Sequence, residues 1–327
     1  MILSIIFFLI KSLCCISIAF FAVLILIKIW LKLNTPMCTC KVRLDEKTVV
    51  VTGSNMGIGF ETAKTLARRG ARVVIASRNE VRSRAAVEAI IEATGNPRVE
   101  YKPLDLSKLS SVKQFADDFN KHYDRLDVLI NNAAFNGFGH VKTEDGIEKV
   151  MQVNHVAPAY LTNLLLDKIV GSKPSRIIFV SSGAHNTHAI DPDDLEGRKP
   201  VNIWTKYSNS KVCNVLSAKA LAKCVPEGVA VNSLHPGVAK TELYDMVPWP
   251  LDALFNFVLE NVCKTPEECA QTTIHLACSP HLERVTGQYF NDLEVDKTHP
   301  SVTDELADRV WENTIALIED RTRRYKN

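Results

Sequence analysis

The sequence lacks four features, each of which is typical of a particular class of protein. It contains no Asn-x-Ser/Thr acceptor for N-glycosylation, which fits a cytosolic location. Its formal net charge of +2 is too small to favour a protein that binds nucleic acid. Its nine cysteines are odd in number and scattered, so they predict reduced thiols rather than a disulfide framework. Cys38 and Cys40 have no second Cys or His pair nearby in the sequence, which argues against a zinc site.

Charge is also scarce in the first 33 residues, which are almost entirely apolar and carry only three lysines. The part from 12 to 31 has about the length that a bilayer core requires, roughly 20 residues. No small-residue cleavage site marks it as a signal peptide. We therefore expect a single membrane anchor at 1–34 followed by a linker at 35–44. A hairpin that turns near Lys11 is the alternative.

The distribution of positive charge predicts which way the anchor is oriented. Lys11 alone lies before the apolar stretch, whereas five basic residues lie at or after its end: Lys28, Lys32, Lys41, Arg43 and Lys47. Positive charge is enriched on the cytosolic side of membrane proteins, so the folded part is expected to face the cytosol. The endoplasmic reticulum is the expected compartment, with lipid droplets or another organelle membrane as alternatives.

Residues 48–70 have the pattern of a dinucleotide-binding unit. A buried β-branched strand is predicted at 48–52, and a helix at about 60–69. The turn between them contains Gly53, Gly57 and Gly59, and Asn55 and Ile58 are further candidate residues within it. Such glycines let the backbone approach a pyrophosphate at the N-terminus of the helix. The spacing is one residue longer than the G-x-G-x-x-G fingerprint, so an ordinary turn is the alternative.

The rest of the chain repeats the alternation of strand and helix. Strands are predicted at 71–76, 99–104, 127–130, 176–180, 229–234 and from 287, and helices at 81–94, 108–123, 146–167, 207–223, 266–278 and 303–320. This order predicts an α/β fold with a doubly wound parallel sheet of the Rossmann type. We expect a single domain at 45–300, then a C-terminal helix and basic tail at 301–327.

The ends of the early strands predict cofactor contacts. Arg78 follows the second strand where an acid would favour NAD, so the sequence favours NADP(H); a solvated charge is the alternative. Asp105, followed by Leu106, is a candidate for contact with adenine or for the N-cap of the next helix. Asn132 and Ala133 end the fourth strand, where small residues let a cofactor pass close to the backbone.

Three later residues have the chemistry of carbonyl reduction. Tyr207 and Lys211 are four residues apart and so share one face of a helix. A phenol has a reference pKa near 10, and an adjacent ammonium brings it toward the working range. Ser182, at the end of a strand, can hydrogen-bond the oxygen on which charge develops. Asn154, in an apolar helix, is a candidate for catalysis or for a structural hydrogen bond.

In this order, the segments TGSNMGIG, NNAA, VSS, YSNSK and HPG resemble the short-chain dehydrogenase/reductase family over roughly 45–293. The resemblance implies that Ser182, Tyr207 and Lys211 are catalytic and that Asn154 assists a proton relay. It implies cofactor contacts from Gly53, Asn55, Gly57, Ile58, Gly59, Arg78, Asp105, Leu106, Asn132, Ala133, Tyr207, Lys211, Pro236, Gly237 and Thr241. Ala134 departs from the family, which usually has glycine there.

The anchor and the segments SRN, VNH and SSGAH resemble the membrane-bound retinol dehydrogenase branch of that family. Residues 241–262 are rich in apolar side chains and are expected to form a lid over an apolar substrate, with core packing or a peripheral membrane contact as the alternative. The implied function is an NADP(H)-dependent oxidoreductase for a lipophilic alcohol and its carbonyl, with retinol and retinal first. A steroid or isoprenoid substrate, or a non-catalytic membrane scaffold, is the alternative. The expected partners are the substrate, membrane lipid and a second copy in a homodimer, without nucleic acid.

Overall fold

In the computed structural model, residues 2–186, 190–238 and 263–323 are described, and within them eight strands form one sheet. The strands are β1 (Thr48–Thr52), β2 (Arg72–Ser77), β3 (Val99–Pro103), β4 (Val128–Asn131), β5 (Ser175–Val180), β6 (Val229–His235), β7 (Tyr289–Asn291) and β8 (Glu294–Val295). Their order is β3-β2-β1-β4-β5-β6-β7-β8. All pairs are parallel except β7 with β8. The predicted doubly wound parallel sheet is confirmed.

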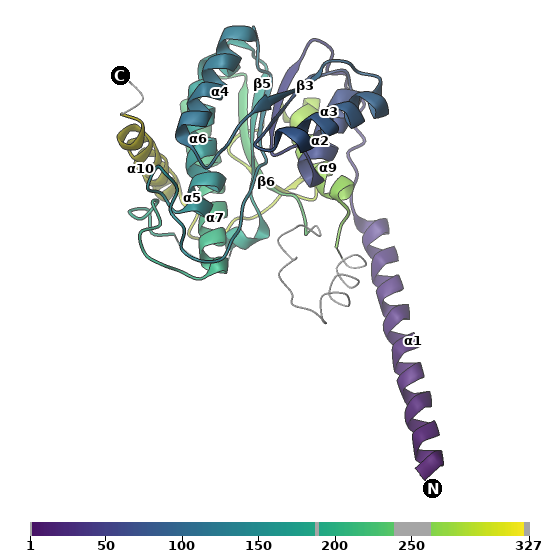
Figure 1. The fold of residues 1–327 in the computed structure, drawn as a ribbon. Coiled ribbons are helices and arrows are strands. Elements are labelled where there is room, and N and C mark those ends of the chain that lie inside the picture. The colour runs from purple at the N-terminus through teal and green to yellow at the C-terminus, as the bar shows by residue number, and fades with distance from the viewer. Residues whose placement is uncertain (1, 187–189, 239–262, 324–327) are drawn as a thin grey trace.

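Helices cover both faces of this sheet (Figure 1). They are α2 (Gly57–Arg68), α3 (Glu80–Thr94), α4 (Leu109–His122), α5 (Lys149–Met151), α6 (Ala157–Gly171), α7 (Ile203–Cys224), α9 (Pro266–Cys278) and α10 (Asp304–Thr322), with short turns of 3₁₀-helix at Gly183–Asn186 and Pro280–Leu282. One apolar layer lies under α4, α6, α7 and α10, and the other lies under α2, α3 and α9. The strands between the layers are buried on both faces, as their β-branched runs predict.

The structure differs from the sequence prediction at the edge of the sheet and in the middle helix. The strand predicted to start at Gly287 begins at Tyr289, and the antiparallel β8 follows it after a tight turn. Asp292 and Leu293 have positive φ angles in that turn, a conformation that the sequence does not signal. The helix predicted at 146–167 begins at Lys149 and contains a π-helical turn, Gln152–Val156.

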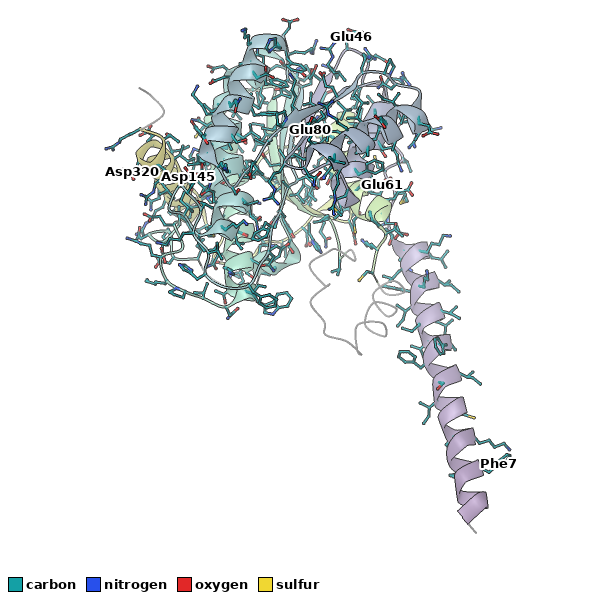
Figure 2. All side chains as sticks on the ribbon, viewed as in Figure 1. Phe7, Glu46, Glu61, Glu80, Asp145 and Asp320 are labelled. Atoms are coloured by element: carbon teal, nitrogen blue, oxygen red, sulfur yellow. The ribbon has the colours of Figure 1, made fainter. Side chains whose placement is uncertain are left out.

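The N-terminal helix α1 (Ile2–Asn34) stands clear of the domain, with Phe7 far out along it (Figure 2). Among the described residues, Cys15–Asn34 is the one candidate membrane span, with a mean hydropathy of 2.3. Its side chains are almost all exposed, unlike those of a core helix. The helix therefore has the length and composition of the expected anchor.

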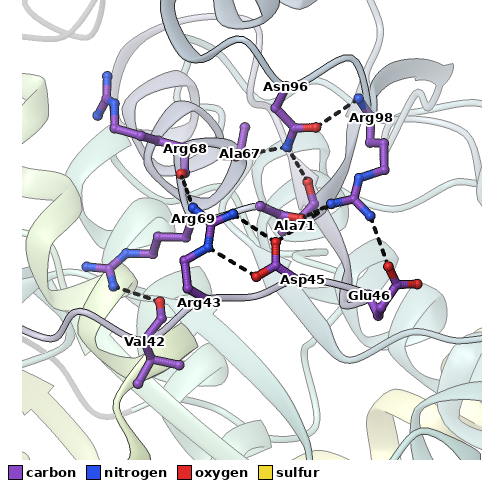
Figure 3. Close-up of polar contacts among 11 residues, drawn as sticks. Val42, Arg43, Asp45, Glu46, Ala67, Arg68, Arg69, Ala71, Asn96 and Arg98 are labelled. Atoms are coloured by element: carbon purple, nitrogen blue, oxygen red, sulfur yellow. Dashed lines mark hydrogen bonds and ion pairs between the residues drawn. The ribbon is translucent and has the colours of Figure 1, made fainter.

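The segment between α1 and β1 is held against the domain rather than hanging free. Leu44 is buried and donates its amide hydrogen to Arg69 O at 2.8 Å. Figure 3 shows Arg69 Nη1 donating to Val42 O, at 3.2 Å. Further back, Cys38 N donates to Gln271 Oε1 of α9 at 3.1 Å. These contacts fix the point at which the chain leaves the domain toward α1.

Candidate functional site

The predicted site residues follow strands whose carboxyl ends meet at one edge of the sheet. The glycine turn follows β1, Asn132 follows β4, Ser182 follows β5 and Pro236 follows β6. The pairings β1–β4, β4–β5 and β5–β6 are all parallel, so these four ends lie side by side. In an open α/β sheet this edge is where ligands bind.

The glycine turn is shaped by contact with the end of β4. Gly53 and Gly57 have φ angles of 63° and 59°, which glycine adopts without strain. A Cβ atom at Gly59 would lie 2.5 Å from Asn132 Nδ2 and 2.6 Å from Gly53 O. Packing therefore requires glycine at position 59. Two further predicted cofactor contacts, Asn55 and Ile58, are half-buried in the same turn.

Asn132 joins β4 to β1. Its Nδ2 donates to Thr52 O at 2.8 Å, and Thr52 Oγ1 accepts from the backbone amides of Asn132 and Ala133 at 3.0 and 2.9 Å. Sequence reasoning missed Thr52, although a hydroxyl at the last position of a buried strand is a usable signal. Ala134 is exposed, so the methyl group that replaces the family's glycine meets open space.

On the strand that pairs with β1 on its other side, Arg78 is exposed immediately after β2. A second arginine reaches the glycine turn: Arg82 Nη1 lies 3.8 Å from Met56 Sδ. Sequence reasoning missed Arg82, which lies on α3 and has no motif around it. Arg82 thus places a guanidinium group at the turn, and Arg78 is a second, exposed arginine at the end of the neighbouring strand.

Asp105 does not cap the following helix, so that alternative is wrong. Its Oδ1 accepts from Ser107 N at 3.0 Å, while the first amide of α4, that of Leu109, donates to Asp145 Oδ2 at 2.9 Å. Leu106 is buried in the core. Asp105 is half-buried at the end of β3, where the prediction of an adenine contact stays open.

The two serines that follow β5 have different environments. Ser181 is buried, and its Oγ donates to Lys211 O at 2.6 Å. Ser182 is half-buried, and its Oγ accepts a hydrogen bond from Ala184 N at 3.2 Å. This bond uses the oxygen of the hydroxyl group and not its hydrogen. Ser182 is therefore the hydroxyl placed to meet a ligand, and Ser181 holds α7 against the strand.

Tyr207 and Lys211 lie together on α7, as their spacing predicts. Lys211 Nζ is 5.6 Å from the centre of the Tyr207 ring and donates to Val180 O at 3.0 Å. Lys211 is 1% exposed, and burial lowers its pKa to about 8 because the ammonium loses its water. The helix begins at Ile203, four residues before Tyr207, so both side chains lie on a formed helix rather than at its first turn.

Asn154 occupies the π-helical turn and joins two parts of the site. Its Nδ2 donates to Phe135 O at 2.9 Å and to Ser210 Oγ at 3.0 Å, and its Oδ1 accepts from Phe135 N at 2.7 Å. Asn154 therefore ties the loop after β4 to α7 beside Tyr207. The structural hydrogen bond that the sequence left as one alternative is present.

The end of β6 supports the turn that follows β5. His235 Nδ1 accepts from Gly183 N at 3.0 Å, and burial is the main cause that lowers the pKa of His235 to about 4. The ring is therefore neutral at physiological pH. Pro236 and Gly237 follow; Gly237 has a φ of 97°, and a Cβ there would lie 2.9 Å from Lys264 Cδ. Thr241 and the predicted lid at 241–262 lie outside the described residues.

The structure places His275 and Cys278 beside Cys38 and Cys40, which the sequence alone does not suggest. Cys38 Sγ lies 3.9 Å from His275 Nδ1, and Cys40 Sγ lies 3.6 Å from the carbonyl oxygen of Cys278. Even so, no group of three or more His, Cys, Asp or Glu within the described residues could hold a metal ion.

Comparison with known proteins agrees with this geometry. The chain is 41% identical to retinol dehydrogenase 13 of Mus musculus over 288 residues, 86% of each protein, and 40% identical to retinol dehydrogenase 11 of Homo sapiens over 291 residues, 88% of this chain and 90% of the relative.

Solved structures have the same fold. A putative uncharacterized protein from Mycobacterium paratuberculosis has a TM-score of 0.68 at 29% identity, covering 85% of this chain and 95% of its own. A putative short chain dehydrogenase from Shigella flexneri complexed with NADP has a TM-score of 0.62 at 27% identity, covering 78% and 100%. The family model described as short chain dehydrogenase matches residues 47–248. The chain belongs to the short-chain dehydrogenase family.

Proposed function

We propose that this chain is an NADP(H)-dependent oxidoreductase that interconverts a lipophilic alcohol and its aldehyde or ketone. Retinol and retinal are the proposed pair because the similar proteins include retinol dehydrogenases at about 40% identity over most of the chain. The observation that carries the proposal is the position of Lys211 beside Tyr207, with Lys211 bound to Val180 O at the end of β5, the strand that Ser182 follows.

The residues at this edge fit a dinucleotide. Gly59 leaves no space for a side chain against Asn132, so the backbone of the turn stays bare where a pyrophosphate would approach. The proposed contacts are those that the resemblance implies, from Gly53 to Thr241. When bound, the nicotinamide would supply or accept a hydride at the substrate carbon.

Four residues of the chain would handle the proton and the substrate oxygen. Tyr207 would exchange the proton with that oxygen, and Ser182 Oγ would hydrogen-bond it while charge develops. Lys211, charged below a pKa of about 8, would stabilise the phenolate form of Tyr207. Asn154 would hold the loop after β4 and α7 in register through Phe135 and Ser210, and would assist the relay of protons.

The preference for NADP(H) over NAD(H) is supported by charge. Arg78 is exposed at the end of β2, Arg82 reaches the glycine turn, and the first acidic residue after the strand is Glu80. A guanidinium group matches the geometry of a 2′-phosphate through two parallel hydrogen bonds. Structures of similar proteins from Shigella flexneri and Escherichia coli contain NADP or NADPH.

The proposed location is the endoplasmic reticulum membrane, with α1 as a single span and the domain in the cytosol. The support is the 20-residue apolar span and the positive charge on its domain side. The proposal includes a homodimer, which rests on the family resemblance alone. Because α10 packs against α7, a partner subunit would have to bind a part of the long helices that α10 does not cover.

The test uses membranes that contain the expressed full chain, with all-trans-retinal and either NADPH or NADH. We expect retinal-dependent oxidation of the cofactor, faster with NADPH, and its loss in Tyr207→Phe. Tyr101→Phe, on β3 away from the site, is the matched control and should retain activity. Turnover by Tyr207→Phe at the normal rate would refute the assigned role. If the unaltered chain binds the nucleotide but turns over no retinal, steroid or isoprenoid carbonyl, the non-catalytic scaffold would be favoured.

A further inference from the structure

Four large apolar side chains are exposed together near the proposed catalytic helix. Phe138 is 69% exposed, Val141 50%, Val201 44% and Trp204 61%. They come from two segments, the loop after β4 and the start of α7. We call these four residues the apolar rim. Exposed aromatic and aliphatic side chains that gather in this way mark an interaction surface more often than isolated ones do.

The two segments of the apolar rim are held against each other. Lys206 Nζ donates to the carbonyl oxygen of Gly139 and lies 3.4 Å from Glu148 Oε1, although Lys206 and Glu148 are both buried. The amide of Lys149 donates to Val141 O at 2.8 Å. Because Lys206 on α7 binds both Gly139 and Glu148, the loop that carries Phe138 and Val141 is held beside the start of α7.

This surface borders the proposed site. Trp204 lies on the first turn of α7, three residues before Tyr207, and Phe138 follows the loop that Asn154 binds through Phe135. The rim therefore flanks the approach to the carboxyl edge of the sheet. Two exposed basic residues stand next to the rim in the sequence: Lys142, and Lys199, whose Nζ lies 3.1 Å from Asp191 Oδ2 in an ion pair.

The anchor leaves the domain on the same side. In Figure 1 the start of α7 lies at one end of the domain, and α1 extends beyond that same end. The exit point is fixed because the segment before β1 is bound to the domain at Cys38, Val42 and Leu44; Figure 3 shows the contact of Val42 with Arg69. A bilayer crossed by α1 would therefore lie on the side where the apolar rim is exposed.

We propose that the apolar rim contacts the surface of the bilayer that α1 spans, with Phe138 and Trp204 at the level of the lipid headgroups. Aromatic side chains are enriched at this depth, and the exposed ammonium of Lys142 suits anionic lipid. The inference rests on the membrane location in the proposed function. Its consequence is that a lipophilic substrate passes from the bilayer to the carboxyl edge of the sheet without crossing water.

The first test places the full chain in nanodiscs of phosphatidylcholine and phosphatidylserine that contain a phospholipid with a photoreactive diazirine near the headgroup. After irradiation, labelled peptides are identified by mass spectrometry. We expect label on α1 and on the peptides containing Phe138 and Trp204. Val81 and Val295, which are 80% and 55% exposed elsewhere, provide the internal control and should stay unlabelled. Label on α1 alone would overturn the proposal, and this readout requires no turnover.

The second test compares Phe138→Ser/Trp204→Ser with the control Val81→Ser/Val295→Ser in the same nanodiscs. We expect the lipid label near residues 138 and 204 to disappear. We also expect KM for a membrane-dissolved carbonyl to rise roughly tenfold, with KM for a water-soluble carbonyl and the melting temperature unchanged. Equal increases in both KM values, with the lipid label retained, would instead make these residues part of the substrate site and would overturn the proposal. Crosslinks between two copies at the rim would also overturn it.

Discussion

Replacing Gly59 with alanine should damage the cofactor turn and the stability of the domain together. The added Cβ would lie 2.5 Å from Asn132 Nδ2, 2.6 Å from Gly53 O and 2.9 Å from Ser54 Cα. Two of these atoms are backbone, and Asn132 can move only by losing its 2.8 Å hydrogen bond to Thr52 O. Overpacking of this kind costs about 1–3 kcal/mol.

For a domain of this size, that cost should lower the melting temperature by roughly 2–10 °C. We also expect the Kd for NADPH to rise more than about tenfold, the factor given by 1.4 kcal/mol, because the turn must shift where the cofactor would approach. The assays are thermal unfolding and fluorescence titration with NADPH on the full chain.

Gly171→Ala is the matched control for this substitution. Gly171 ends α6, and a Cβ there would have nothing within 4 Å. Alanine is the better helix former, so this variant should be as stable as the unaltered chain or slightly more stable. If Gly59→Ala behaves like Gly171→Ala in both assays, the steric reading of the glycine turn is refuted.

Two other predictions concern charge in the site. Arg78→Asp should weaken NADPH binding roughly 10- to 100-fold, the loss of one charge-assisted contact, and should leave NADH binding little changed; equal effects on both cofactors in parallel titrations would show that Arg78 does not read the phosphate. Burial lowers the pKa of Lys211 to about 8, so its ammonium is present below this pH and lost above it. We expect kcat/KM for carbonyl reduction to fall as the pH rises through about 8, and a flat profile between pH 6 and 10 would contradict the role of Lys211.

The sequence predicted the elements whose local pattern and tertiary environment agree. The buried runs of β1 and β5 were placed within one residue, because continuous β-branched stretches suit a strand covered on both faces. Helix α9 was placed at its observed bounds, where Thr265 and Glu268 form a capping box. Tyr207 and Lys211 were paired correctly because a helical period fixes their shared face.

The features that the sequence did not reveal depend on contacts between distant parts of the chain. The cap of α4 comes from Asp145, 36 residues beyond Leu109, while the nearby Asp105 binds Ser107 instead. The pair of Lys206 with Glu148 joins segments 58 residues apart. The β7–β8 turn requires positive φ angles at non-glycine residues, which packing imposes and composition does not signal.

The π-helical turn at Gln152–Val156 sets a constraint on the length of the chain. A π-helical turn is an α-helix with one residue inserted, so it offsets everything after it by one position. Deleting one residue would restore a regular helix, but it would rotate Asn154 relative to α6 by roughly 100°, the angle per residue of an α-helix. The side-chain amide of Asn154 would then lose its hydrogen bonds to both Phe135 and Ser210. The helix that follows could change in sequence, but this stretch could not lose a residue without separating the loop after β4 from α7.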